Sequence, residues 1–316
     1  MKRLAISLIG GLLWISLCDG QDATSWENIR RMPTPRSEIA SAVVEGRIYV
    51  VGGVSIRGSL RAFEALDPGT GRWTRCSPLP EKLNHSGVVG HGRSIYVSGG
   101  FRDLFQRKRS DSLWRFDVDT GRWTKVARMP SSRVKHVMIE RDGWLHLIGG
   151  LRHREIWSYQ IEKGTWQTDR IPPLPDLRDH ISVLQDGEAL YVFGGRNGKV
   201  PQPDCWIHQV GRDRWSVLTR LPEARGGQTA VMHENRIHVV GGEDQRNKQT
   251  FRRYDIFDLG SKSWKRGPGF PVPRHGLTSE RIGDSWYVIG GGRLSHLSTI
   301  VSASGRAYRI GLSGTQ

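Results

Sequence analysis

Cysteine is scarce in this sequence, which excludes a small disulfide-stabilised fold. Three cysteines occur among 316 residues, whereas disulfide scaffolds are dense in cysteine. Beyond residue 20 no apolar run is long enough to cross a bilayer as a helix. Glycine shows no three-residue period, so the chain is not collagen-like. Acidic residues are also few: 31 Asp+Glu against 47 Lys+Arg give a formal charge of +16, which favours anionic partners.

The first 20 residues have the three parts of a secretory signal. Residues 1–3 are mainly basic, residues 4–17 are almost wholly apolar, and Cys18 and Gly20 supply the small residues that precede a cleavage after Gly20. We therefore expect a signal peptide at 1–20, a secreted or periplasmic protein of net charge +15, and no transmembrane segment once the signal is removed. An uncleaved anchor and lipid modification at Cys18 are the alternatives.

One unit of about 47 residues occurs six times along the chain. A Gly-Gly pair ends a short apolar run in each unit, at 52–53, 99–100, 149–150, 194–195, 241–242 and 290–291. A tight-turn pair such as Glu45-Gly46 or Asp142-Gly143 precedes that run, which predicts a β-hairpin. A lone tryptophan marks a later strand, at Trp26, Trp73, Trp123, Trp166, Trp215 and Trp264. The pattern predicts four strands in each unit.

This repeat resembles the kelch repeat, a four-stranded blade with Gly-Gly followed by an aromatic residue and then tryptophan. The resemblance covers residues 24–310 and implies an all-β, six-bladed β-propeller. Trp26 precedes the first Gly-Gly pair, and no tryptophan follows the last pair. We therefore expect the strand near 24–32 to complete the last blade and close the ring, and residues 21–316 to form a single propeller domain.

No motif of a common enzyme class is visible. Nucleophile elbows, P-loops, dinucleotide fingerprints and paired-cysteine zinc motifs are all missing. Cys76 and Cys205 occupy repeat positions that are apolar in other units, which indicates buried free thiols rather than a disulfide. Secreted kelch-like propellers include copper-radical oxidases, but no tyrosine or cysteine is free of a core position here. No cofactor and no metal are expected.

Repeat positions that differ between units are the candidates for function. Two such positions should line one rim of the channel: the stretch after the Arg slot and the stretch after Gly-Gly. The predicted ligand-binding residues there are Arg102, Lys135, His136, Arg152, Arg196, Asn197 and Arg293. Arginine can grip a carboxylate or sulfate with two hydrogen bonds. An alternative is that these residues are merely solvated loop ends.

An arginine recurs 16 residues before the first glycine of each pair. It is found at Arg36, Arg133, Arg178, Arg225 and Arg274, with Leu83 in the second unit. A residue type that recurs at the same repeat position is expected to serve the fold. We therefore predict that these arginines bond to carbonyls of a neighbouring blade rather than to a ligand. We call this repeat position the Arg slot.

Three functions are compatible with the sequence. The first is an exported, monomeric binding propeller for an acidic glycan or an acidic protein. The second is a sugar isomerase, since small exported kelch proteins resemble the bacterial sialic-acid mutarotases; Glu38, His180, Glu243 and His275 would then be candidate catalytic acids and bases. The third is a scaffold that docks proteins on its outer face. Nucleic acid is not expected as a partner, because no aromatic ladder accompanies the basic residues.

Overall fold

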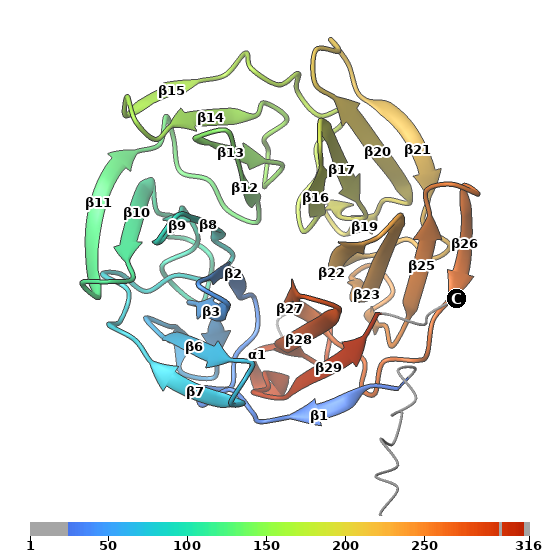
Figure 1. Cartoon of the computed structure of the whole chain (residues 1–316), viewed down its shortest axis with the longest axis horizontal. Coiled ribbons are helices and arrows are strands. Elements are labelled where there is room, and N and C mark those ends of the chain that lie inside the picture. Colours follow the sequence, from blue (N-terminus) through green and yellow to red (C-terminus); the bar gives the residue numbers. More distant parts are fainter. Residues whose placement is uncertain (1–24, 297–298, 313–316) are drawn as a thin grey trace, which may run out of the picture.

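The computed structural model describes residues 25–296 and 299–312, and these form a ring of six β-sheets around a central channel. Figure 1 shows the blades arranged around the axis, each with one strand facing the channel and one at the perimeter. The expected all-β, six-bladed propeller is confirmed. The expected signal peptide at 1–20 lies outside the described residues.

Each of the first three blades is a four-stranded antiparallel sheet, ordered from the channel outwards as the chain runs. They contain β2 (Ala40–Val44), β3 (Arg47–Val51), β6 (Phe63–Asp67) and β7 (Arg72–Arg75); β8 (Gly87–His91), β9 (Ser94–Ser98), β10 (Ser112–Asp117) and β11 (Arg122–Arg128); β12 (Val137–Arg141), β13 (Trp144–Ile148), β14 (Trp157–Gln160) and β15 (Thr165–Gln167).

The last three blades repeat this order, and the sixth takes its outermost strand from the start of the chain. They contain β16 (Ser182–Asp186), β17 (Ala189–Phe193), β20 (Asp204–Gln209) and β21 (Ser216–Arg220); β22 (Gly226–His233), β23 (Arg236–Asp244), β25 (Tyr254–Asp258) and β26 (Ser263–Arg266); β27 (His275–Ile282), β28 (Ser285–Gly292), β29 (Ala307–Gly311) and β1 (Glu27–Ile29).

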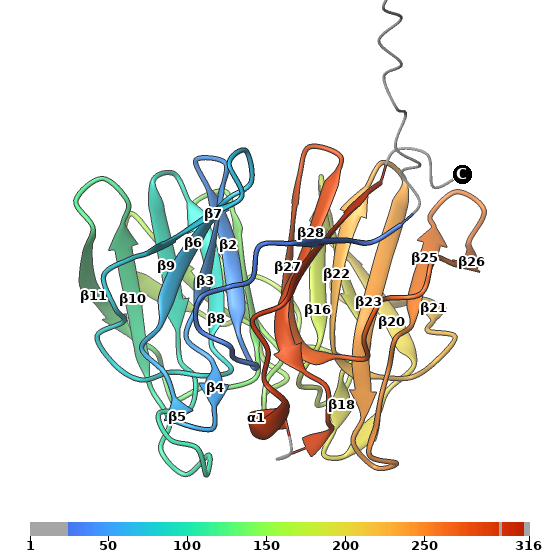
Figure 2. The same cartoon turned by 90° about the horizontal axis from the view of Figure 1, so that it is seen from below.

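The loops between the second and third strands of the blades carry the remaining elements. These are the hairpins β4 (Val54–Ser55) with β5 (Gly58–Ser59) and β18 (Arg196–Asn197) with β19 (Val200–Pro201), strand β24 (Gln249–Thr250) and the four-residue helix α1 (Thr299–Ser302). In Figure 2, β4, β5, β18 and α1 lie at the same end of the ring, below the blades. We call this end the mouth face. Within the described parts of the chain, no helix is long and apolar enough to cross a membrane.

The hydrophobic core is divided into six clusters, one between each pair of neighbouring blades. Side chains alternate along a strand, so one strand serves two clusters. Ile48 and Val50 of β3 pack toward the sixth blade, whereas Tyr49 and Val51 pack toward the second. This alternation explains why a blade cannot be stable alone: both of its faces are apolar and both need a neighbour.

The Gly-Gly corner connects each blade to the next. Gly53 has a φ of 104°, and its N–H donates to the carbonyl of Leu83, which belongs to the next unit. A Cβ at Gly53 would lie 2.5 Å from Ile39 Cγ2 and 2.8 Å from the Ser37 carbonyl oxygen. Equivalent N–H bonds join the second glycine of the other pairs to the Arg slot of the following unit. Glycine is required here by both conformation and space.

The Arg-slot side chains are buried, as expected for a structural role, but the expected partners were wrong. Each guanidinium bonds mainly within its own unit, not to a neighbouring blade. Arg133 donates to the carbonyls of Gly149 and Leu147, at 2.9 and 3.0 Å. Arg225 donates to Asp255 at 2.9 Å, and both side chains are almost fully buried. The backbone carbonyl at each slot position accepts a hydrogen bond from the second glycine of the preceding unit. The arginine side chain therefore lies under the Gly-Gly corner of its own unit.

The tryptophans at the perimeter bond backwards along the chain. The indole N–H groups of Trp73, Trp123 and Trp166 donate to the carbonyls of Arg30, Ser77 and Arg128 at 2.8–2.9 Å. Each acceptor follows the outer strand of the preceding blade, or ends it in the case of Arg128. The repeated tryptophan therefore fixes one blade against another.

The two ends of the chain close the ring, as predicted. β1 pairs antiparallel with β29, with Asn28 opposite Tyr308. Trp26 packs edge-on against Phe270 at 4.8 Å between ring centroids, and its indole donates to the Pro268 carbonyl. Figure 1 shows β1 alongside β29 at the perimeter of the sixth blade.

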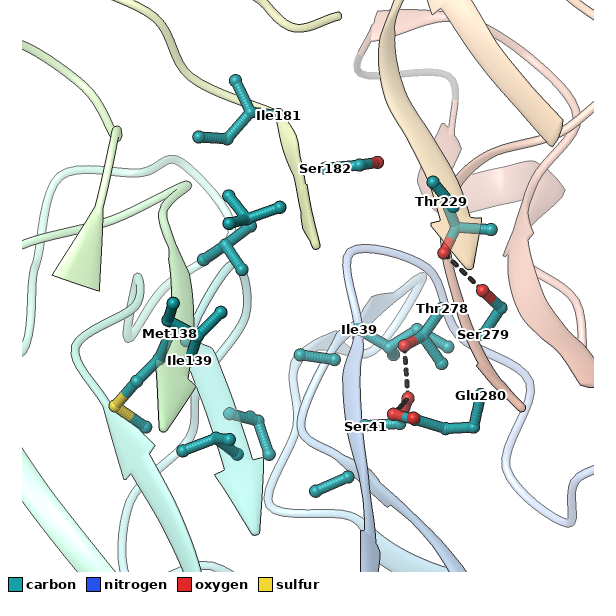
Figure 3. A pocket seen from close by; sticks show the side chains of 18 of the residues that line it. Ile39, Ser41, Met138, Ile139, Ile181, Ser182, Thr229, Thr278, Ser279 and Glu280 are labelled. Atoms are coloured by element: carbon teal, nitrogen blue, oxygen red, sulfur yellow. Dashed lines mark hydrogen bonds between the residues drawn. The ribbon is translucent and has the colours of Figure 1, made fainter. Parts of the chain in front are cut away.

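The channel is a cavity of about 560 Å³ lined by the innermost strands. Figure 3 shows Ser41, Thr278 and Glu280 on one side of it and Ile139 and Ile181 on the other. Ser41 Oγ lies 2.5 Å from Thr278 Oγ1 and donates to Glu280 Oε1 at 2.7 Å. The channel thus has a polar stripe on one wall and an apolar surface opposite.

Cys76 and Cys205 are free thiols, as predicted. Cys205 is buried and Cys76 only half-buried, so the core assignment holds fully for Cys205 alone. Burial raises the pKa of Cys205 to about 12 and that of Cys76 to about 11, which keeps both thiols protonated and unreactive.

Candidate functional site

A ring of six equivalent backbone positions surrounds the channel at the mouth face. Each lies two residues after the Arg slot and has a positive φ, between 53° and 67°; they are Glu38, His85, Lys135, His180, Gly227 and Gly276. We call these residues the mouth ring. Backbone hydrogen bonds with N–O distances of 2.7–3.2 Å join five of the six neighbouring pairs, including Glu38 N to Gly276 O. The blades therefore meet around the channel through their backbones.

Four members of the mouth ring are not glycine, although the conformation favours glycine. A left-handed backbone costs an L-residue on the order of 1 kcal/mol. The two remaining members, Gly227 and Gly276, show that glycine fits the ring. Strained residues that persist where glycine would serve are a mark of functional positions. The ring therefore directs attention to its four large polar side chains.

Glu38 lies at the centre of a group of three imidazoles. Its Oε2 is 3.0 Å from His85 Nε2 and 3.8 Å from His180 Nε2, and its Oε1 is 3.6 Å from His275 Nδ1. Burial alone would raise the pKa of Glu38, but His85 and the other two imidazoles outweigh it and hold this pKa well below the ordinary value. Glu38 is consequently a buried carboxylate anion.

Hydrogen bonds from the preceding residues orient two of the imidazoles. His85 Nδ1–H donates to the amide oxygen of Asn84, and His180 Nδ1–H donates to the Asp179 carboxylate. In both cases Nε2 is left facing Glu38. Burial, with the nearby Arg196, lowers the pKa of His180 to about 4 against the opposing effect of Asp179. His180 is therefore a neutral imidazole at physiological pH.

A second buried carboxylate, Glu243, completes the group from the fifth blade. It accepts a hydrogen bond from Arg196 Nη1, and its Oε2 accepts from Ser295 Oγ at 2.6 Å and from His296 N at 3.1 Å. Burial opposes ionisation, but His275 and Arg196 lower the pKa of Glu243 to about 2. Arg196 Nη2 also donates to His180 Nε2 at 3.1 Å, so the two carboxylates belong to one network.

This network forms the floor of a cavity of about 340 Å³ that opens on the mouth face. Three loops supply its walls: residues 104–106, residues 196–199 and the segment with His296, Thr299 and Ile300. The long loop after the second Gly-Gly pair thus overhangs the mouth. Lys135 lines the same cavity, and burial lowers the pKa of its ammonium group.

The catalytic candidates from the sequence all lie in this network, whereas the predicted ligand-binding residues are dispersed. Glu38, His180, Glu243 and His275 converge there, and so do Lys135 and Arg196. The others do not reach it: Arg102 pairs with Glu81 at 3.0 Å, and Arg152, Asn197 and Arg293 are exposed on loop tips. His136 is buried against Gly87 of the second blade and bonds Ser98 Oγ at 2.8 Å, where burial holds its pKa well below the ordinary value.

Several contributors to the site were not among the assigned site residues. Ser295 and His296 come from the loop between β28 and β29, for which the repeat pattern offered no counterpart. His85 was visible at the rim position, and its sixfold equivalence with Glu38 and His180 was the signal that could have identified it.

The mouth network contains carboxylates, imidazoles and paired cations, but no hydroxyl nucleophile is hydrogen-bonded to one of its imidazoles among the described residues. The arrangement is suited to binding: it presents fixed donors and acceptors at the base of an open cavity.

Comparisons with known proteins agree with the repeat pattern. A family model described as the KLHDC2/KLHL20/DRC7 Kelch-repeats domain matches residues 13–150 and 127–291. Kelch-like protein terF of Aspergillus terreus is 26% identical over 288 residues, which cover 82% of this chain and 61% of that protein. Kelch-like protein 35 of Mus musculus is 29% identical over 253 residues, covering 78% of this chain and 41% of the relative.

Beta-scruin of Limulus polyphemus is 24% identical over 279 residues, which cover 80% of this chain and 30% of that protein. The chain thus spans less than two thirds of the length of these relatives. Six repeats in phase, six blades closed by the N-terminal strand and a family match over most of the sequence lead to one conclusion: the chain belongs to the kelch-repeat family.

Proposed function

We propose that this kelch propeller, a type of domain that typically binds proteins, uses its mouth face to bind an acidic segment of a protein partner. One observation carries the proposal. Every blade exposes at least one basic side chain on the loop between its second and third strands; examples are Arg57, Arg107, Arg152, Lys199, Arg246 and Arg293. We call these six residues the basic crown. A circle of positive charge around a cavity steers and retains an anionic ligand.

Inside the cavity the charged side chains pair with one another, whereas most residues of the crown form no salt bridge with another described residue. Glu243 and Asp179 take up Arg196, with Asp179 Oδ1 3.4 Å from Arg196 Nε. In the crown, Arg246 has only a distant contact with Asp244, at 3.9 Å. An approaching anion therefore meets the crown before it meets any paired group.

Exposed apolar side chains favour a protein over a carbohydrate as the partner. Ile56 (74% exposed), Phe105 (72%), Leu294 (51%), Val301 (65%) and Val200 (44%) all lie on the same loops as the crown. Apolar anchors surrounded by polar residues are characteristic of protein interfaces. The expected ligand is a loop or tail that combines carboxylates with one or two apolar residues.

The test uses immobilised protein and three soluble probes: an oligoglutamate peptide containing one leucine, the same peptide with glutamine for glutamate, and a sulfated oligosaccharide. The acidic peptide should bind, and its affinity should fall as salt rises. Equal binding of the glutamine peptide would refute the electrostatic argument. Binding of the sulfated sugar alone would replace the protein partner by an acidic glycan.

Matched triple variants locate the surface. Arg107, Lys108 and Arg109 lie on the loop that overhangs the mouth, and changing all three to serine should weaken binding at least fivefold, on the order of 1 kcal/mol. Arg72, Arg122 and Lys163 follow or form turns at the opposite end, and the same change there is the control with equal loss of charge. Equal weakening by both triples would show non-specific attraction and overturn the proposal.

We also propose that the protein is exported, on the basis of the signal-like first 20 residues. Intact-mass measurement of the protein recovered from a secreting host should show loss of residues 1–20. Recovery of the full-length chain would contradict cleavage after Gly20.

The sugar-isomerase alternative has weaker support. Glu38 and Glu243 both have lowered pKa values, so each is suited to accept a proton but not to donate one. NMR exchange between the anomers of a sialic acid tests it directly, and acceleration by the protein would establish the activity.

A further inference from the structure

Three metal-ligating side chains from three blades converge at the centre of the mouth ring. Glu38, His85 and His180 precede the innermost strands of the first, second and fourth blades. Their ligand atoms all lie within 4.8 Å of one another, and the three side chains are almost fully buried. We propose that Glu38, His85 and His180 bind one divalent transition-metal ion of the Zn²⁺ type, with the remaining coordination positions open to the mouth cavity.

The hydrogen bonds of the two imidazoles prepare them for this role. Because His85 Nδ1–H donates to Asn84 and His180 Nδ1–H donates to Asp179, the Nε2 atoms are the ring nitrogens that lie toward Glu38. Metal-binding histidines usually have this arrangement, in which the far nitrogen donates to a carboxylate or carbonyl oxygen and fixes the ring. The orienting residue immediately precedes the histidine in both cases.

His275 provides an independent sign that a cation belongs here. Its Nε2–H donates to the carbonyl of Leu294 at 2.9 Å, so Nδ1 is the ring nitrogen that faces the carboxylates. That Nδ1 has no hydrogen-bond partner, the residue is 1% exposed, and the atom lies 3.6 Å from Glu38 Oε1 and 3.6 Å from Glu243 Oε1. A buried nitrogen that has no hydrogen-bond partner and lies beside two carboxylate oxygens marks a point where positive charge is stabilised.

The charge of the network permits a divalent cation. Three carboxylates, those of Glu38, Asp179 and Glu243, face two side-chain cations, Arg196 and Lys135. A metal ion must displace the bond from Arg196 Nη2 to His180 Nε2, but Arg196 keeps its two carboxylate partners when that bond is lost.

The donor set indicates the class of metal. Two imidazole nitrogens and one carboxylate oxygen suit Zn²⁺ and also Co²⁺, Ni²⁺ or Cu²⁺. Mg²⁺ and Ca²⁺ prefer sites built from oxygen. Three protein ligands leave an open position, and here that position faces a cavity of about 340 Å³. An anionic group of a ligand in the cavity could occupy it.

The experiment is calorimetric titration of tag-free, EDTA-treated protein with zinc chloride and, separately, with magnesium chloride. One Zn²⁺ should bind per chain and Mg²⁺ should not bind. His85→Gln and His180→Gln should each weaken Zn²⁺ binding at least tenfold. His91→Gln is the control, because His91 is 40% exposed at the opposite end of the channel, where it pairs with Glu140 at 3.1 Å.

A second measurement gives a result on the wild-type protein that does not depend on how the variants fold. Electron paramagnetic resonance of the Cu²⁺ complex of the wild-type protein should show coupling to at least two nitrogen nuclei, and folded His85→Gln should show one fewer. The proposal is overturned if the wild-type protein binds no Zn²⁺, if Mg²⁺ binds equally well, or if the copper spectrum shows fewer than two nitrogens. It is also overturned if His91→Gln weakens binding as much as His85→Gln does.

Discussion

Glu280 in the channel wall should make the stability of the propeller fall as pH rises. Its carboxyl group is desolvated by burial, and the hydrogen bond from Ser41 offsets this only in part, so its pKa is raised from 4.5 to about 7. An acid whose pKa is raised by folding binds a proton more tightly in the native state than in the unfolded chain. Its favourable contribution is complete at low pH and is lost as pH rises through about 7.

The size of the effect follows from the pKa. A rise from 4.5 to about 7 corresponds to about 3 kcal/mol in the free energy of unfolding. Glu280→Gln keeps an acceptor for Ser41 but does not ionise. Relative to the wild type, the variant should therefore gain about 3 kcal/mol of stability between about pH 4 and about pH 8.

The assay is urea unfolding followed by tryptophan fluorescence at several pH values. Subtracting wild type from variant removes the contributions of all other titrating groups. Glu162→Gln, which removes an exposed carboxylate, is the control and should show no comparable trend. A variant-minus-wild-type difference that does not change with pH would refute a protonated Glu280 in the channel wall.

Three further predictions test the fold. Gly53→Ala should lower the free energy of unfolding by about 3 kcal/mol, because the new methyl group meets packed atoms at a positive φ; Gly269→Ala, with open space around it and no positive φ, is the control, and equal losses would contradict the steric argument. Arg225→Met should cost about 3 kcal/mol, because it removes the fully buried one of the two arginines that pair with the buried Asp255; urea unfolding measures this, and a neutral result would show that Arg253 suffices. Trp26→Ala should cost about 3 kcal/mol and increase amide exchange in β29 first, whereas uniform exchange would argue against closure by β1.

The sequence alone was enough to predict the number of blades and their closure. Gly-Gly, tryptophan and the tight turns recur at fixed intervals because every blade must solve the same packing problem against its neighbours. Trp26 without a preceding Gly-Gly pair was sufficient to assign the first strand to the last blade. Such features are local and repeated, so they can be identified without coordinates.

The mouth site was only partly predictable. Glu38 and His180 were recognised as rim residues because their repeat position varies between units. Arg152 and Arg293 were assigned to the same rim, yet both lie on exposed loop tips. Repeat position specifies where a side chain leaves the backbone, but loop conformation determines where the side chain ends.

Only the tertiary structure revealed the convergence of Glu38, His85 and His180. They are far apart in the chain, and they meet because a circle of blades with left-handed residues at the same position directs their side chains toward one axis. The loop before β29 likewise brings Ser295 to Glu243. The repeat therefore determined the ring of blades, because six blades that pack in the same way require the same residue types at the same repeat positions. The ring geometry decided the site, since contacts across the axis are not encoded in any single repeat.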